Sequence, residues 1–379
     1  PTLEVDAGTG GYLSWSDGAV MVRVPMGAGS GPVRLVTRRG SDLSELVNLV
    51  RPAGEVRYEN PREWALRQEV SLHSFRGDGA GEIYLWLPDV QPSAAQRRIQ
   101  LLNESHPPAV RFQEQARLYR LAPPRPATEQ SEEAAAPEEI RLARTFLFER
   151  YEVAAEVAPS LVPVEYELDP AFLRRYTRPE GRLRMGDEAI VAFASNSVGR
   201  VRNRYEQASW IYQETLRLLE PAPDGASDPL QALGEGPASS AGYAALMVAA
   251  LREVGIPARE AAGVLFLEGV RSVPHRWVEL YLPEFGWFPA DPALGDGLFI
   301  DQLPPRPEES EAGSFYFGNL DNRRGVFSHG EIPTPSMEMR GEATRPSGAY
   351  ALQKTYEEAS DAVGEYESDW PVPELIGSY

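Results

Sequence analysis

The segment from residue 238 to residue 292 limits the possible folds of this chain most, because it places a helix, a strand and a returning turn in a fixed order. Apolar residues at three- and four-residue spacing predict a helix that begins beside serines near 238 and stops at Gly255. Residues 273–282 then alternate between two faces, which predicts a half-buried strand. Residues 286–292 follow a short turn and return beside that strand.

The predicted pairing brings three polar positions together. His275 lies on one face of the alternating strand with Trp277, while Val278 lies on the other face. The returning strand carries Asp291 toward His275, and the start of the helix carries Ser240. A helix start, a histidine and an aspartate that converge have the layout of a thiol active site, yet the chain contains no cysteine.

Three motifs in this segment resemble those of the bacterial transglutaminase-like superfamily, relatives of the papain-like thiol hydrolases. The matching stretches are Arg252 to Arg259 (R-x-x-G-I-P-A-R), His275 to Glu279 (H-x-W-V-E) and Gly286 to Pro292 (G-W-x-x-x-D-P). The resemblance implies a catalytic triad at Ser240, His275 and Asp291, with serine at the position of the nucleophilic cysteine. The glycine that usually precedes the cysteine falls on Ala238.

This replacement matters for the chemistry that the resemblance implies. A cysteine at a helix start beside an imidazole becomes a ready thiolate, whereas a serine hydroxyl must lose its proton to the base during attack. Ser240 therefore has three interpretations. It is an N-cap in an inactive site that keeps its structure, the nucleophile of a Ser-His-Asp hydrolase or amidase, or an engineered substitute for a native cysteine.

The resemblance extends from about Asp169 to Pro333 and implies an α+β fold with a papain-like transglutaminase core. All-β, sandwich-like domains are predicted ahead of that core from short alternating segments separated by turn residues. The predicted domains are a small β unit at 1–52, a β-sandwich at 53–168 with a flexible acidic hairpin loop near 123–139, the core at 169–335, and an acidic, extended C-terminal extension at 336–379.

Within the core, helices are predicted at 187–198 and 204–220, and a loop at 221–236. The segment 318–328 resembles the strand that closes the core in bacterial relatives. Glu279 shares a face with His275, so it either pairs with an arginine or faces solvent.

Composition limits the partners. The formal net charge of -19 excludes nucleic acid and an anionic membrane surface as attractive partners, and no apolar run reaches the roughly 18 residues of a membrane span. The remaining histidines lack metal-ligand spacing, so neither a metal nor a cofactor is predicted. The resemblance implies a peptide, protein or cell-wall fragment as the ligand of the inherited cleft. It also implies an exported protein, although no signal sequence is found in this chain.

Overall fold

The computed structural model describes residues 12–47 apart from 17, 23, 25–30 and 38, 54–124 apart from 78 and 114, 139–337 apart from 235, 270, 284 and 304–308, and 350–378. Within these residues the fold is α+β, as predicted, with the α-helices all between residues 170 and 315. No described helix is long and apolar enough to cross a membrane.

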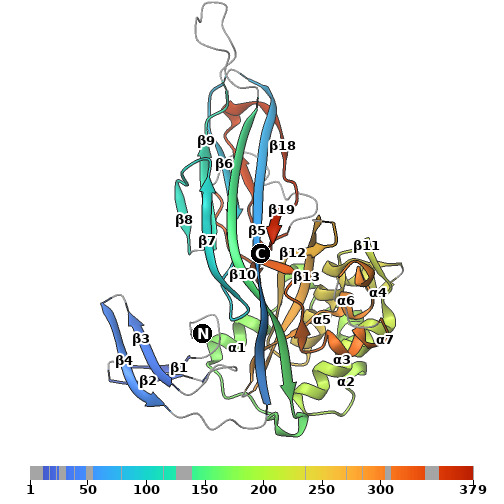
Figure 1. Ribbon diagram of the computed structural model, residues 1–379. Coiled ribbons are helices and arrows are strands. Elements are labelled where there is room, and N and C mark those ends of the chain that lie inside the picture. Colours follow the sequence, from blue (N-terminus) through green and yellow to red (C-terminus); the bar gives the residue numbers. More distant parts are fainter. Residues whose placement is uncertain are drawn as a thin grey trace, which may run out of the picture.

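Two long strands run through most of the molecule. β5 (Gly54–Arg76) and β10 (Ile140–Val157) are antiparallel along almost their whole length, from Leu72 opposite Ile140 to Gly54 opposite Val157. Figure 1 shows this pair running from the β-rich end of the molecule to the helical end. Four further strands pair with the two: β7 (Gln96–Glu104), β15 (Asn319–Leu320), β18 (Glu365–Asp369) and β19 (Glu374–Ser378).

A second sheet covers one end of this pair and completes the predicted sandwich. Its strands, in spatial order, are β17 (Glu357–Ala359), β6 (Ile83–Pro88), β9 (Ala116–Leu121) and β8 (Val110–Phe112). Leu85 and Tyr119 from this sheet meet Leu72 and Leu142 from the long strands in one buried apolar cluster. Alternating apolar residues on both sheets thus bury a common face, as in other β-sandwiches.

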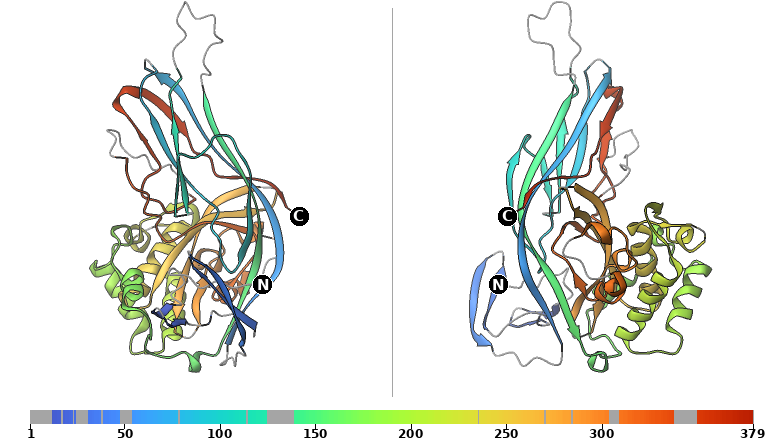
Figure 2. Two further views of the ribbon diagram at one scale, coloured as in Figure 1. Left: turned by 90° about the vertical axis from the view of Figure 1, so that its left-hand side faces the viewer. Right: turned by 45° about the vertical axis from the view of Figure 1, so that its right-hand side comes forward.

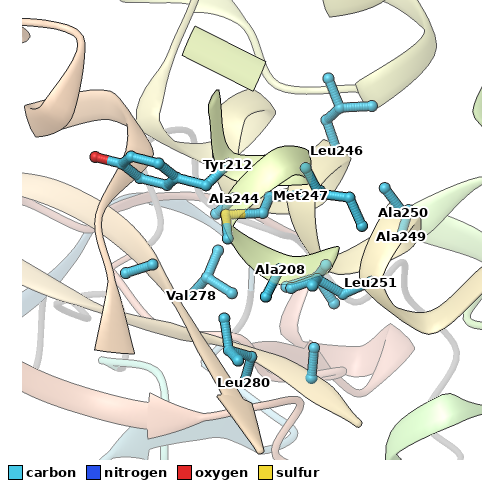
Figure 3. Packing of buried hydrophobic residues seen from close by; sticks show 14 of the residues in the cluster. Ala208, Tyr212, Ala244, Leu246, Met247, Ala249, Ala250, Leu251, Val278 and Leu280 are labelled. Carbon is cyan, nitrogen blue, oxygen red and sulfur yellow. The ribbon is translucent and has the colours of Figure 1, made fainter. Parts of the chain in front are cut away.

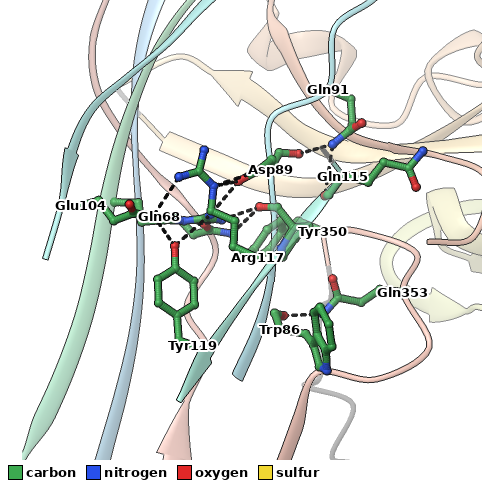
Figure 4. Close-up of polar contacts among 12 residues, drawn as sticks. Gln68, Trp86, Asp89, Gln91, Glu104, Gln115, Arg117, Tyr119, Tyr350 and Gln353 are labelled. Carbon is green, nitrogen blue, oxygen red and sulfur yellow. Dashed lines mark hydrogen bonds and ion pairs between the residues drawn. The ribbon is translucent and has the colours of Figure 1, made fainter. Parts of the chain in front are cut away.

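A buried polar network also ties the two sheets together (Figure 4). The fully buried Arg144 on β10 donates to Asp89 at 2.6 Å and to the carbonyl of Pro88 at 2.6 Å. Gln68 on β5 accepts from Arg144 and donates to the Tyr350 hydroxyl at 2.5 Å. Because Arg144 has several hydrogen-bond partners and an acidic one, its charge is tolerated in the sandwich interior.

The C-terminal tail forms part of the sandwich. β17 pairs with β6, and both β18 and β19 pair with β5. Glu357 is buried there because the Tyr366 hydroxyl donates to it at 2.6 Å and the Trp370 indole at 3.0 Å. One acid of the tail is therefore satisfied by its aromatic residues, while Glu365 and Asp369 pair with Arg76 and His73 of β5.

The structure differs from two loop predictions, at 123–139 and at 221–236. Most of the predicted loop at 123–139 lies outside the described residues, but β9 and β10 belong to different sheets, so this segment does not close a hairpin as predicted. The predicted loop at 221–236 was wrong, since it contains β11 (Pro221–Ala226) and α4 (Pro229–Gly234). Both elements are short and rich in proline, glycine and alanine, which hides them from pattern reading.

The core sheet contains four antiparallel strands. Their order is β14 (Gly286–Ala290), β13 (Arg271–Leu282), β12 (Ala258–Leu267) and β16 (Arg324–His329). One face packs on the long strands, where Trp277 and Leu265 share a cluster with Val56 and Val153. As predicted, the strand that carries Trp277 turns Val278 to the opposite face.

The opposite face of the core sheet packs on α5 (Ser240–Glu253), which is buried along almost its whole length. Figure 3 shows Met247 and Leu251 of α5 against Val278 and Leu280 of β13. Figure 2 shows α2 (Glu188–Val198), α3 (Arg204–Leu218), α4, α6 (Pro292–Gly295) and α7 (Glu309–Phe315) grouped with α5. α1 (Pro170–Thr177) packs on Tyr281 and Trp287. The predicted helices near 187–198 and 204–220 correspond to α2 and α3.

The N-terminal strands form two separate hairpins. β1 (Tyr12–Trp15) pairs with β2 (Val20–Val22), and β3 (Gly31–Thr37) with β4 (Gly40–Val47). Among the described residues, neither hairpin pairs with a strand of the sandwich or of the core sheet.

We therefore expect a chain that lacks residues 1–53 to unfold cooperatively, with a urea midpoint close to that of the full chain. Tryptophan fluorescence during urea unfolding measures this. As a matched control, removal of residues 361–379 deletes two strands that pair with β5 and should lower the midpoint clearly. Loss of a cooperative transition in the N-terminal truncation would show that the hairpins belong to the folded core.

Candidate active site

The start of α5 is held by β11. The backbone N–H of Ser239 donates to the carbonyl of Ala226 at 3.0 Å, and that of Ala238 donates to the carbonyl of Glu220 at 2.7 Å. Ser239 occupies the N-cap position, but its hydroxyl donates to the Ala226 carbonyl at 3.2 Å and caps no helical N–H. The first helical residue is Ser240, which is 8% exposed.

Two glycines allow this close approach. A Cβ atom on Gly242 would lie 2.3 Å from the Ala226 carbonyl oxygen, and one on Gly225 would lie 2.6 Å from the backbone of Ala238. Any larger residue would force the strand and the helix start apart. Backbone contacts that only glycine permits therefore fix the position of Ser240.

His275 and Asp291 are in direct contact. His275 lies on β13 opposite Gly263, and Asp291 follows the last residue of β14. Nε2 of His275 and Oδ2 of Asp291 are 2.8 Å apart, and both side chains are fully buried. Asp291 also caps α6, because Oδ1 accepts from the N–H of Leu294 at 3.1 Å. The aspartate is thus anchored by a helix and fixes one nitrogen of the imidazole.

Ser240 reaches the same strand without bonding to the ring. Its Oγ accepts from the backbone N–H of Arg276, the residue after His275, at 3.3 Å. Nδ1 of His275 is buried and has no hydrogen-bond partner among the described residues. The structure therefore brings His275 and Asp291 into contact and places Ser240 beside β13, the strand that carries His275.

Arg324 completes the site from the other side of Asp291, and sequence reasoning missed it. Its guanidinium donates to Oδ2 of Asp291 at 2.9 Å and to Oδ2 of Asp321 at 2.5 Å, and it lies 4.9 Å from the centre of the Trp277 ring. Arg324 is fully buried. An arginine at the beginning of an apolar strand, three residues after an aspartate, is the signal that could have revealed it.

These contacts set the charge of the carboxylates. Burial raises the pKa of Asp291, but His275 and Arg324 outweigh burial and hold it below its usual value. Burial likewise raises the pKa of Asp321, and Arg324 more than offsets it. Both aspartates are thus ionised at neutral pH, and Arg324 stays protonated because they raise its pKa against the effect of burial.

Glu279 occupies a second buried ionic cluster on the same strand. Its Oε2 accepts from Arg259 at 2.7 Å and lies 3.0 Å from Nδ1 of His329. Burial raises the pKa of Glu279, but the opposite effect of His329 and Arg259 is larger, so the pKa lies below its usual value. Of the two alternatives for Glu279, the structure shows the arginine pair. Arg259 also lies 4.0 Å from the Trp287 ring centre, within a cluster of packed aromatics.

Comparison with known proteins agrees with this arrangement. A family model described as the transglutaminase-like superfamily matches residues 191–292, which contain α5, β13 and Asp291. This part of the chain is therefore similar to the transglutaminase-like superfamily. A comparison with curated proteins finds no match.

Several solved structures are similar to the chain at low identity. One, described as a candidate cysteine protease from Cytophaga hutchinsonii, has 12% identity and a TM-score of 0.45, and the match covers 86% of this chain and 91% of the other. The periplasmic domain of TgpA from Pseudomonas aeruginosa has 18% identity and a TM-score of 0.34, over 66% of this chain and 92% of the other. A structure described as a TGase has 13% identity and a TM-score of 0.28, over 56% of this chain and 52% of the other.

The burial of Arg324 between two aspartates predicts that its charge stabilises the fold. Changing Arg324 to Met leaves Asp291 and Asp321 without their cation, which should lower the free energy of unfolding at pH 7 by about 3–5 kcal/mol. The folded pKa values of both aspartates lie below their unfolded values, so the stabilisation is present at neutral pH and is lost as pH falls through the folded values. The difference between wild type and variant should therefore shrink below about pH 4.

Urea unfolding at pH 7 and at several acidic pH values measures this difference. Arg217→Met is the matched control, because Arg217 is exposed and pairs with Glu214 on its own helix. It should resemble wild type at every pH. An Arg324→Met penalty that stays constant with pH would show that lost packing, and not uncompensated charge, causes it.

Proposed function

We propose that this protein is a binding module for a peptide or a cell-wall peptide fragment, and that its cleft descends from an acyl-transfer site with a disarmed nucleophile. The proposal assigns the inherited nucleophile position to Ser240 and the inherited base and orienting acid to His275 and Asp291. The contact between His275 and Asp291 supports this assignment, as do the two sequence motifs that contain these residues and the third motif at the end of α5.

One observation carries the choice of a binding module over a hydrolase. In a serine hydrolase, the nucleophile donates its hydroxyl proton to the free nitrogen of the histidine. Here Nδ1 of His275 lacks a partner among the described residues, and the Ser240 hydroxyl accepts from the Arg276 backbone instead. A serine needs such a base during attack, because its own pKa lies far above that of a thiol.

The second candidate is an active Ser-His-Asp hydrolase or amidase, which the short His275–Asp291 contact favours. In that case Ser240 attacks a carbonyl carbon, His275 takes the hydroxyl proton and gives it to the leaving amine, and Asp291 orients the ring. The backbone N–H of Ser240 then donates to the oxyanion. An engineered exchange of a native cysteine for Ser240 would leave the same geometry. An exported location forms part of the proposal, on the family resemblance.

A serine-directed probe separates the two candidates. Fluorophosphonate should leave Ser240 unlabelled in the full chain, because no base draws off its proton, and mass spectrometry of the digested protein measures the labelling. Ser240→Ala is the control for labelling at other serines. Stoichiometric labelling of Ser240 that disappears in His275→Ala would establish the hydrolase and reject the binding module.

The electrostatics of the site can be tested by restoring the sulfur. The start of α5 and His275 should lower the pKa of a cysteine at position 240 below the usual value of about 8.5. The Ser240→Cys protein, whose thiol is unique in the chain, should therefore alkylate with iodoacetamide at pH 6 at least about tenfold faster than free cysteine. His275→Ala in the same background should slow the reaction.

The matched control for this test is Ser197→Cys, on α2 and outside the site, which should react like an ordinary thiol. Equal rates at positions 240 and 197 would mean that the inherited electrostatic arrangement has decayed. A fast reaction that does not depend on His275 would assign the effect to the helix start alone.

A further inference from the structure

Arg150 is a buried cation that the candidate site does not use. It lies on β10, is 2% exposed, and has a buried Nε atom without a hydrogen-bond partner among the described residues. Within the part of the chain that the structure describes, its guanidinium also forms no ion pair. A buried charge is costly unless it is paired and hydrogen-bonded, and a guanidinium has five N–H donors and no acceptor. Arg150 therefore needs an acceptor that carries a negative charge.

The surrounding charges do not neutralise Arg150. Burial lowers its pKa most, and the repulsion by Arg324 is the next largest effect. Asp321 and Glu279 act in the opposite direction, and the resulting pKa of about 9 leaves Arg150 protonated at neutral pH. Asp321 is already paired with Arg324. Glu279 is likewise paired with Arg259. Each nearby carboxylate thus has an arginine of its own, at a shorter distance than Arg150.

Two neighbouring side chains add further donors. Burial raises the pKa of Tyr58 to about 12, while the charges of Arg97 and Arg150 both act to lower it, so both guanidiniums lie near this phenol. Arg97 lies 5.3 Å from the centre of the Tyr58 ring, and its Nη2 is buried without a partner in the described ranges. Tyr58 also packs on the apolar cluster that contains Trp277. These donors therefore gather between the long strands and the core sheet.

The same interface holds more positive than negative groups. The charged groups that act on Tyr58 or Arg150, together with their ion-pair partners, are the arginines Arg97, Arg150, Arg259 and Arg324 and the carboxylates Glu279, Asp291 and Asp321. Four arginines face three carboxylates, so one positive charge has no counterpart. Protonation of His275 or His329, which also contact these carboxylates, would only add to the positive side.

We infer that Arg150, Arg97 and the Tyr58 hydroxyl bind a small inorganic anion such as chloride in the interface between the long strands and the core sheet. A halide needs only donors, and these three side chains supply N–H and O–H groups. A water molecule would satisfy the donors but would leave the charge of Arg150 unbalanced. Tyr58 and Arg97 are only partly buried, so the interface is reached from their side. The inference does not involve Ser240 and is independent of the proposed function.

The anion would also affect the candidate site through Arg324. It would offset the charge of Arg150 and so weaken the repulsion between Arg150 and Arg324, the arginine that donates to Asp291. An ion that binds the folded chain and not the unfolded chain stabilises the fold by mass action. The stability of the full chain should therefore depend on chloride.

Thermal unfolding of the full chain measures this dependence. Tryptophan fluorescence is followed at pH 7 in sodium chloride and in sodium gluconate of equal ionic strength, since gluconate is too large for a site between packed strands. We expect chloride to raise the unfolding midpoint saturably, by at least about 2 °C at about 100 mM, relative to gluconate.

Three variants assign the effect to residues. Arg150→Met keeps an unbranched side chain without the guanidinium, so the chloride effect should disappear, and in gluconate this variant should be at least as stable as wild type. Tyr58→Phe keeps the ring and removes one donor to the anion, so it should need about tenfold more chloride for half the effect. Arg217→Met, on an exposed face of α3, is the matched control and should respond like wild type.

Equal midpoints of wild type in chloride and gluconate would overturn the anion site, as would a chloride effect that Arg150→Met retains. An unchanged affinity in Tyr58→Phe would overturn the assignment of the hydroxyl. A direct measurement decides the question even where Arg150→Met does not fold. Crystals of the full chain in sodium bromide should give an anomalous bromine peak within hydrogen-bond reach of Arg150 and the Tyr58 hydroxyl, and the lack of a peak there would overturn the inference.

Discussion

The carboxylate of Asp291 is the group on which the site depends, because it joins three elements of the core. It caps α6, holds Nε2 of His275 on β13 and accepts from Arg324 on β16. A fully buried carboxylate is costly unless it is paired and hydrogen-bonded, and here each oxygen has a fixed donor. The same interactions that make its burial tolerable fix the imidazole and the order of the strands around it.

The long strands connect this cluster to the sandwich. Arg150 on β10 is almost fully buried, and burial together with the nearby Arg324 lowers its pKa to about 9. Asp321 raises the pKa of Arg150. The carboxylate of Asp321 therefore interacts with two arginines, Arg150 and Arg324, that lie on different sheets. Val56 and Val153 from the long pair also pack on Trp277. The long strands of the β-rich part of the molecule therefore pack directly against the candidate site.

The sequence was most informative where a local pattern determines structure. Strict alternation around His275 settles which residues face the helix, and the turn before Gly286 returns the chain beside that strand. The same reasoning predicted α2, α3 and the α+β class. The approach of Asp291 to His275 follows from the register of these two strands.

Contacts between residues far apart in the sequence could not be predicted from local patterns. The tail strands pair with residues about three hundred positions earlier, and the acids in the tail concealed that pairing. Arg324 is fixed by contacts with Asp291 and Trp277, which only the folded chain brings together. β11 and α4 lack any periodicity, although β11 determines where Ser240 lies through contacts at Gly225 and Gly242.

The identity of residue 240 changes the balance of charge more than the geometry. A thiolate at the helix start would be a third negative group in the site, beside Asp291 and Asp321. With Ser240 the same donors remain, and Arg324 already balances one of the two aspartates. Under the proposed function, a neutral hydroxyl at position 240 therefore leaves the contacts of Asp291, His275 and Arg324 in place while it removes one negative group from the site.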